Sequence, residues 1–204
     1  MHAVEVIRYP MMESFYTIQG EGAYTGAPSY FIRLGGCDVG CVWCDVKESW
    51  HAHDHDYKTI PELLDLVKKA EANRVVVTGG EPCMYDLKEL TDRFHKESIS
   101  LHLETSGVYE ISGDWDWVCF SPKKFKKPMD NVYTKADELK IVVFHPSDLK
   151  WAQTHAERVG EHCKLYLQPE WNRRDQLLPI ILNHVMENPE WNISLQTHKY
   201  LGVP

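Results

Sequence analysis

Three cysteines crowded into eight residues are the part of this sequence best suited to chemistry. Cys37, Cys41 and Cys44 lie in the segment GGCDVGCVWCD, with the spacing CxxxCxxC. A short loop that contains Gly36 and Gly40 can curl so that three thiolates surround a small inorganic group such as a 4Fe-4S cluster. Three ligands for four irons leave one iron open, which predicts a cluster that takes part in chemistry as well as electron transfer.

A structural zinc site is the alternative for the same cysteines. Tetrahedral zinc accepts three cysteines and one histidine, and His51, His53 and His55 follow closely in the sequence. Zinc loops usually offer their ligands in CxxC pairs, however, and this loop has only one such pair. A zinc site would also leave the polar clusters at the ends of the predicted strands without a role. We expect the histidines to lie in a solvated loop.

Length and composition restrict the class of protein. A chain of 204 residues with 43% hydrophobic content can bury one core, so residues 1–204 are expected to form a single domain. The net charge of −8 disfavours nucleic-acid binding. The start MHAVEVIRYP lacks the pattern of a signal peptide, and no apolar run is long enough for a membrane span, so we expect a cytoplasmic protein. In that reducing compartment disulfides are not expected, and the remaining cysteines are predicted core residues: Cys83, Cys119 and Cys163.

Strand and helix patterns alternate along the chain and must position the cysteine loop. The strand pattern SYFIRL ends just before Gly35 and Gly36, which places the cysteines on a loop after a strand. Strands are predicted at residues 29–34, 74–78, 99–103, 117–120, 139–144, 164–167 and 192–195, and helices at 59–73, 86–97, 147–159 and 175–186. This alternation predicts an α/β fold, a partial, open βα barrel with about six parallel strands.

Polar or glycine-rich clusters follow nearly every predicted strand. The carboxyl ends of parallel strands meet at one edge of a sheet, and ligands bind there. We therefore expect these clusters to line a common site: residues 79–82, 104–107, 121–123, 145–146, 168–170 and 197–198.

The cysteine motif, with Trp43 before its last cysteine, resembles the signature of the radical S-adenosylmethionine superfamily. The segment TGGEP at 78–82 resembles the second motif of that superfamily. The resemblance implies a 4Fe-4S cluster on Cys37, Cys41 and Cys44, whose open iron binds S-adenosylmethionine. The reduced cluster then cleaves the sulfonium to give a 5′-deoxyadenosyl radical. Glycines at 79 and 80 would let backbone carbonyls approach the ammonium group of that cofactor.

Further segments resemble the 7-carboxy-7-deazaguanine synthase family, which acts in queuosine biosynthesis, a tRNA modification pathway. They are FYTIQGEG at 15–22, the stretch 26–33, the cysteine loop, TGGEP, ETSG, SPK, a Gln-Pro pair and QTHKYLG at 196–202. The resemblance implies a lyase that converts 6-carboxy-5,6,7,8-tetrahydropterin to 7-carboxy-7-deazaguanine with loss of ammonia. It further implies that the radical removes a hydrogen from C6 and later returns it, that an external electron donor such as flavodoxin is needed, and that the protein is a homodimer.

Site residues follow from the same resemblance. The residues implied for the pterin substrate are Ile18, Gln19, Gly20, Arg33, Thr78, His198 and Pro204. Arg33 would bind the substrate carboxylate as a fork, a surface salt bridge being the alternative. The carboxylate of Pro204 would accept hydrogen bonds from the guanidine-like edge of the pterin, and a structural role is the alternative for His198. The residues implied for S-adenosylmethionine are Gly80, Glu104, Ser121, Pro122, Lys123, Gln168, Pro169, Glu170 and Trp171.

Magnesium is implied by the family, but the sequence departs from the family pattern where the ion would bind. Family members commonly carry Ser or Thr two residues after the last cluster cysteine, and here that residue is Val46. Val46 has no side-chain oxygen, and no matching role passes to Asp45. The nearest alternative function is a glycyl-radical activating enzyme, which shares the cysteine loop and TGGEP but does not require the IQGEG turn.

Overall fold

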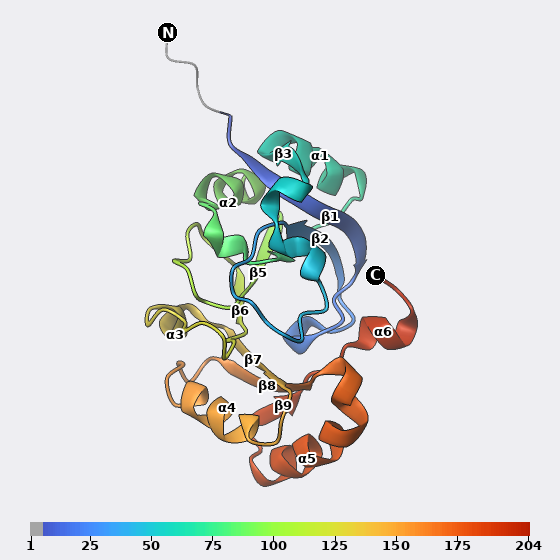
Figure 1. The fold of residues 1–204 in the computed structure, drawn as a ribbon. Coiled ribbons are helices and arrows are strands. Elements are labelled where there is room, and N and C mark those ends of the chain that lie inside the picture. Colours follow the sequence, from blue (N-terminus) through green and yellow to red (C-terminus); the bar gives the residue numbers. More distant parts are fainter. Residues whose placement is uncertain (1–5) are drawn as a thin grey trace.

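The structure is a computed structural model that describes residues 6–204. The first five residues, which belong to the segment predicted not to be a signal peptide, lie outside this range. In the described chain a single sheet has the strand order β3-β1-β2-β4-β5-β6-β7-β8-β9, running from one open edge at β3 to the other at β9 (Figure 1). Strands β2 and β4 to β9 are parallel, whereas β1 pairs antiparallel with both β2 and β3. The predicted open α/β fold is therefore present, with seven parallel strands in place of about six.

The bounds of the elements agree closely with the patterns in the sequence. The strands are β1 Arg8–Ile18, β2 Pro28–Leu34, β3 Asp56–Thr59, β4 Arg74–Gly79, β5 Ser100–Thr105, β6 Trp117–Phe120, β7 Glu138–Val143, β8 Lys164–Pro169 and β9 Trp191–Ile193. The α-helices are α1 Ile60–Lys69, α2 Lys88–His95, α3 Val132–Lys135, α4 Asp148–Ala156, α5 Arg174–Glu187 and α6 Thr197–Leu201. Helices α1, α2, α4 and α5 follow strands and pack beside the sheet, which creates parallel crossovers.

Helix α1 shows how local chemistry sets these bounds. Thr59 and Glu62 form a reciprocal capping box at its first turn, and the helix buries Leu63, Leu64 and Val67 on one face. The helix ends at Lys69, earlier than the predicted end at residue 73. Glu71 has a left-handed backbone with φ of 52°, which an α-helix cannot contain.

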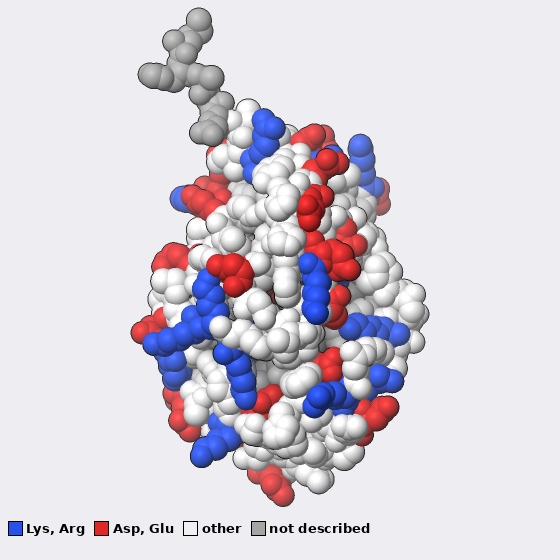
Figure 2. Space-filling view, viewed as in Figure 1, with Lys and Arg blue, Asp and Glu red and all other residues white. Residues whose placement is uncertain are grey.

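The core lies between the sheet and the helices that pack on it, and acidic and basic side chains are interspersed over the surface (Figure 2). Val75, Val77, Leu101 and Leu103 of the central strands are fully buried, and Phe94 of α2 packs among them. Cys83, Cys119 and Cys163 are buried as predicted. No helix in the described part of the chain is long and apolar enough to span a membrane.

Strands β1 and β3 and the short helices α3 and α6 were not predicted from the sequence. Strand β1 contains Pro10 and has an irregular register between Met11 and Glu13, which breaks the alternation of polar and apolar residues. Its antiparallel pairing with β2 carries the chain from Phe15 to Ile18 toward the amino end of β2, and the turn that follows reaches across the sheet to Glu104 of β5 and Lys140 of β7. The missed strand therefore delivers the IQGEG turn to the candidate site.

Candidate active site

A cavity of about 670 Å³ opens where the carboxyl ends of the parallel strands converge. Its wall includes residues from five of the six predicted strand-end clusters. The exception is the pair His145 and Pro146, which is exposed and lies outside the cavity. The carboxylate of Asp148 accepts hydrogen bonds from the backbone amides of Phe144 and His145 and folds that loop into the start of α4. Phe144 lines the cavity instead.

All but one of the predicted site residues line this cavity. They are Ile18, Gln19, Gly20, Arg33, Cys37, Cys41, Cys44, Thr78, Gly80, Glu104, Ser121, Lys123, Gln168, Pro169, Glu170, Trp171, His198 and Pro204. Pro122, between Ser121 and Lys123, is buried and does not line it. Val46, at the expected magnesium position, is also in the wall.

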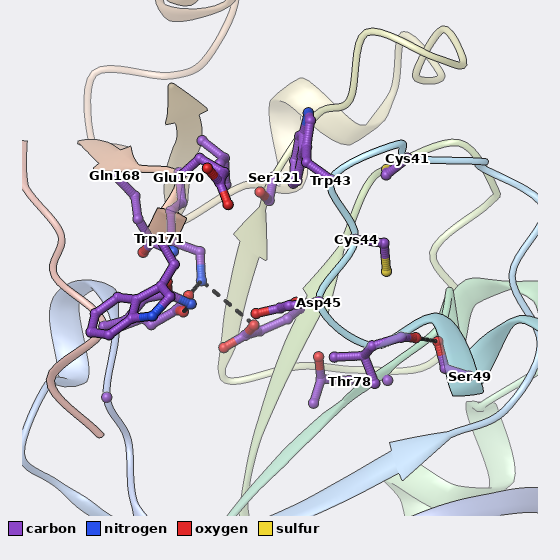
Figure 3. Close-up of a pocket in the computed structure, with 18 of the residues that line it drawn as sticks. Cys41, Trp43, Cys44, Asp45, Ser49, Thr78, Ser121, Gln168, Glu170 and Trp171 are labelled. Carbon is purple, nitrogen blue, oxygen red and sulfur yellow. Dashed lines mark hydrogen bonds and ion pairs between the residues drawn. The ribbon is translucent and has the colours of Figure 1, made fainter. Parts of the chain in front are cut away.

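The three-cysteine loop forms one side of the cavity. Figure 3 shows Cys41 and Cys44 on the side opposite Gln168, Glu170 and Trp171, with Asp45 between the two groups. The cysteines pack around a small apolar cluster formed by Val39, Cys41 and Val108. Burial raises the pKa of the Cys37 thiol and raises that of Cys41 to about 11. Without a bound metal these thiols are therefore neutral.

The TGGEP segment packs against the cysteine loop and holds it by backbone hydrogen bonds. The Gly80 amide donates to the carbonyl of Leu34 at 2.8 Å, and the Glu81 amide donates to the carbonyl of Gly36 at 2.8 Å. A Cβ atom at Gly80 would stand 2.2 Å from the Gly36 oxygen, so the two backbones touch. Close packing on the cysteine loop thus requires a glycine at this position, and the approach of its backbone to the cofactor stays a prediction.

The carboxylate of Glu81 is fully engaged inside the protein. It is 1% exposed and accepts hydrogen bonds from the backbone amide of Cys83, the Thr105 hydroxyl and both donors of Ser106. Glu81 of the TGGEP segment therefore links the end of β4 to the end of β5 by hydrogen bonds. It fixes the strand ends on which the cavity depends.

The wall opposite the cysteines comes from the ends of β6 and β8. Lys123 donates to the Ser121 hydroxyl at 2.5 Å and lies 5.6 Å from the centre of the Trp43 ring, and burial lowers the pKa of its ammonium group. Gln168 accepts a hydrogen bond from Ser194 at 2.7 Å. Glu170, Trp171 and Ser121 carry polar edges that face the cavity (Figure 3). Lys124 pairs with Asp148 outside the cavity.

Arg33 makes the ion pair that the sequence left as an alternative. Its guanidinium lies 2.8 Å from the carboxylate of Glu13 and 5.2 Å from the centre of the Phe15 ring. The Arg33 side chain is nevertheless only 25% exposed and lines the cavity. The pair with Glu13 fixes the guanidinium at the edge of the site.

The carboxyl-terminal segment closes the cavity beside the IQGEG turn. Thr197 donates to the Gly20 carbonyl from its amide and from its hydroxyl, both at 2.9 Å. The ring of His198 lies against Gly20, where a Cβ atom would stand 2.0 Å from Nδ1. Burial lowers the pKa of His198. Lys199 is 2.9 Å from Asp45, next to the last cysteine, and so connects α6 to the cysteine loop.

Comparison with known proteins assigns this arrangement to a family. Residues 31–116 match the model of the radical SAM superfamily. A 7-carboxy-7-deazaguanine synthase from Flavobacterium psychrophilum is 49% identical over 96% of this chain and 92% of its own length, and one from Synechocystis sp. is 43% identical over 97% and 94%. The crystal structure of QueE from Escherichia coli superposes with a TM-score of 0.83 at 31% identity, covering 92% of this chain and 93% of that one. The chain belongs to the 7-carboxy-7-deazaguanine synthase family.

Membership of the 7-carboxy-7-deazaguanine synthase family, within the radical SAM superfamily, implies an iron-sulfur cluster and S-adenosylmethionine. The cysteine loop fits the cluster, because it offers three thiols and no competing ligand from the histidine loop: His51 and His53 are exposed. Within residues 6–204 no three His, Cys, Asp or Glu side chains gather around a point where one metal ion could bind. Zinc needs all its ligands at one point, whereas each thiolate of a cluster takes a different iron.

Magnesium does not fit the residues that follow the last cysteine. Val46 has no side-chain oxygen, and its backbone carbonyl already accepts hydrogen bonds from the amide and the hydroxyl of Ser49, the latter at 2.6 Å. The carboxylate of Asp45 is paired with Lys199. Oxygen ligands that are committed in this way do not provide the coordination that magnesium requires. No step is assigned to this ion.

Glu21 and Lys140 are among the charged cavity residues for which the sequence predicted no role. Glu21 lies in the IQGEG turn but received no role of its own, and Lys140 lies inside strand β7, where the apolar pattern ELKIVV hid it. A lysine within a buried strand was the available signal, because a buried ammonium needs anionic partners. Glu104 accepts a hydrogen bond from Gln19 at 3.0 Å and so contacts a residue predicted for the substrate, while its assignment to S-adenosylmethionine stays a prediction.

Proposed function

We propose that this chain is a radical S-adenosylmethionine enzyme that converts 6-carboxy-5,6,7,8-tetrahydropterin to 7-carboxy-7-deazaguanine with loss of ammonia. The observation that carries the proposal is the meeting of two motifs in one cavity. The cysteine loop resembles the whole radical S-adenosylmethionine superfamily, whereas the IQGEG turn resembles one family within it. Cys44, Gln19 and His198 nevertheless line the same cavity. The identity to named synthases over nearly the whole chain supports the choice of substrate.

The residues divide between two ligands. Cys37, Cys41 and Cys44 would hold the cluster, and the wall formed by Ser121, Lys123 and residues 168–171 would hold S-adenosylmethionine. When bound, these two groups supply the radical that takes a hydrogen atom from the substrate. The protein's part is to orient the pterin and exclude water. The radical must lie close to the hydrogen that it removes and must not meet another hydrogen-atom donor.

The pterin would lie between the IQGEG turn and the cysteine loop. Arg33 would bind its carboxylate, with the guanidinium already oriented by Glu13. Gln19 and Gly20 would meet the polar edge of the ring, and Thr78, His198 and Pro204 complete the wall on that side. Ile18 and the stacked rings of Phe15 and Phe31 supply an apolar surface.

The surroundings of the enzyme form part of the proposal. We infer an external low-potential electron donor such as flavodoxin, because the chain has no second cysteine motif that could hold a further cluster. A cytoplasmic location is supported by six free cysteines, since such thiols persist in a reducing compartment. Homodimer formation and a role of the product in queuosine biosynthesis are carried over from the family.

An anaerobic turnover assay tests the proposal. The protein is reconstituted with iron and sulfide and incubated with S-adenosylmethionine, a reductant and carboxytetrahydropterin, and the products are identified by mass spectrometry. We expect 7-carboxy-7-deazaguanine together with ammonia. A glycyl-radical activating enzyme would cleave S-adenosylmethionine but leave the pterin unchanged. That result would overturn the substrate while leaving the radical chemistry in place.

A further inference from the structure

A buried lysine, Lys140 of strand β7, lines the cavity. The Lys140 side chain is 4% exposed, and its Nζ lies 2.5 Å from Oε2 of Glu21 and 3.5 Å from Oε2 of Glu104. A buried ammonium is costly unless it is paired and hydrogen-bonded, and a fold retains one only where carboxylates compensate for it. Lys140 thus joins two acids that come from distant parts of the chain.

Each of these acids also holds a glutamine amide. Glu104 Oε1 accepts a hydrogen bond from Gln19 Nε2 at 3.0 Å, and Glu21 Oε1 accepts one from Gln196 Nε2 at 2.9 Å. The backbone amide of Glu21 in turn donates to Gln19 Oε1 at 3.1 Å. Glu21, Lys140, Glu104 and Gln19 therefore form a closed ring of polar contacts, and all four line the cavity.

The ring fixes the orientation and the charge of its members. Gln19 must point its oxygen toward the Glu21 amide and its nitrogen toward Glu104, so the amide has one orientation only. Burial works to raise the pKa of Glu21, but Lys140, Gln196 and His198 outweigh it and lower this pKa to about 2. Burial likewise works against the charge of Lys140, yet the neighbouring carboxylates hold the pKa of Lys140 well above its usual range.

We propose that Lys140 is a positioning residue of the substrate site, which pairs with Glu21 and Glu104 and thereby holds Gln19 in a single orientation toward the pterin. The proposal rests on the proposed function, because it names the pterin as the ligand that the ring receives. Lys140 acts through the two acids. The carboxylate oxygens of the ring are hydrogen-bond acceptors, so the edge of the ligand that meets the ring carries hydrogen-bond donors.

Other ionisable groups face the same cluster and must be considered in any pH experiment. They come from the elements packed around the ring: Glu138 on β7, Cys119 on β6, Lys123 after β6 and His198 on α6. Burial raises the pKa of Glu138 and of Cys119, and burial lowers the pKa of Lys123 and of His198. In each case burial favours the neutral form of the group. Lys140 is therefore the main compensating cation for the two acids.

Replacing the ammonium by a thioether of similar length tests the proposal. Lys140→Met is expected to keep its cluster absorption and the slow reductive cleavage of S-adenosylmethionine without substrate. Its kcat/KM for the pterin at neutral pH should fall about 100-fold, because removing the ammonium leaves the buried carboxylate of Glu21 without its cation. Without Lys140 the pKa of Glu21 rises, so turnover should recover as the pH is raised, whereas the unmodified protein shows no such rise. Lys88→Met, which removes an exposed lysine paired with Asp92 on α2, is the matched control and should match the unmodified protein.

The outcomes separate this inference from the proposed function. If the unmodified protein makes no deazapurine, the proposed function fails. If it does, and Lys140→Met keeps the same kcat/KM or loses activity equally at every pH, the positioning role is wrong. Should Lys140→Met fail to fold, Lys140→Arg decides: it keeps the charge and should retain pterin turnover with an unchanged pH profile. A folded Arg variant that cleaves S-adenosylmethionine but leaves the pterin unchanged would also overturn the proposal.

Discussion

Cys37, Cys41 and Cys44 differ from the other cysteines in where their thiols lie. The first three line the cavity, whereas Cys83, Cys119 and Cys163 are buried away from it. Cys41 shows that burial alone does not separate the groups, because it is 7% exposed, the same as Cys163. The distinction lies in access to the shared cavity, and it can be tested by paired substitutions.

We predict that Cys44→Ser abolishes the iron-sulfur cluster. After anaerobic reconstitution, its iron content and its visible absorption should fall to background, because one of three thiolate ligands is lost. Cys163→Ser is the control and should bind iron normally. It should unfold more easily, by about 1–3 kcal/mol, because it places a hydroxyl in an apolar core. Full iron loading of Cys44→Ser would contradict the assignment of this ligand.

At the scale of elements, the site depends on how the end of β4 packs on the cysteine loop. The close contact between Gly80 and the Gly36 carbonyl leaves no room for a side chain. Neighbouring hydrogen bonds from the amides of Gly80 and Glu81 hold the two segments together. The cysteine loop is thus placed by backbone contacts that a larger residue at position 80 would break.

We predict that Gly80→Ala displaces the cysteine loop and removes most of the turnover. The added Cβ would meet backbone atoms that cannot rotate away, so the iron content should also fall. Gly160→Ala is the control, since the nearest atoms there belong to the His162 side chain, which can move. Retention of normal iron content and turnover by Gly80→Ala would show that the loop is more adaptable than this packing indicates.

The sequence predicted the parallel strands well and the antiparallel edge poorly. Strands such as β6, at Trp117–Phe120, are short apolar runs between polar clusters, and these signals survive into the structure. Strand β1 escaped because Pro10 and the irregular register near Met11 disrupt its pattern. Helix α6 is only five residues long, and its position is set by tertiary contacts of Thr197 with Gly20.

The residues of the candidate site were predicted best where they belong to a sequence motif. The cysteines, TGGEP and IQGEG all lie in the cavity, but Lys140 has no motif and was read as part of an apolar strand. The ion pair of Arg33 with Glu13 depends on the register of β1 against β2, which local sequence does not specify. Contacts across strands therefore account for most of what was missed.

At the scale of the whole molecule, two buried histidines couple stability to pH. His102 on β5 is 4% exposed and His155 on α4 is 6% exposed. Burial, with a smaller contribution from nearby arginines, lowers the pKa of each to about 4. His155 also accepts a hydrogen bond from the Tyr133 hydroxyl at 2.7 Å when Nδ1 is unprotonated. The folded protein thus holds both rings neutral.

We predict that the protein loses stability as the pH falls from about 6.5 to 4. In that window the unfolded chain binds protons that the folded chain excludes, so each histidine lowers the free energy of unfolding by up to about 1.4 kcal/mol per pH unit. Above pH 6.5 this contribution is constant. Urea unfolding at several pH values should show the slope, and His155→Gln should reduce it. An equal slope in that variant would exclude His155 as a source.

The number of product molecules formed for each S-adenosylmethionine consumed tests the central claim most directly. If the cavity returns the abstracted hydrogen to the substrate, the cofactor is regenerated. Anaerobic reactions with limiting S-adenosylmethionine and excess carboxytetrahydropterin should then yield many molecules of 7-carboxy-7-deazaguanine for each one consumed. Formation of 5′-deoxyadenosine without any deazapurine would contradict the account.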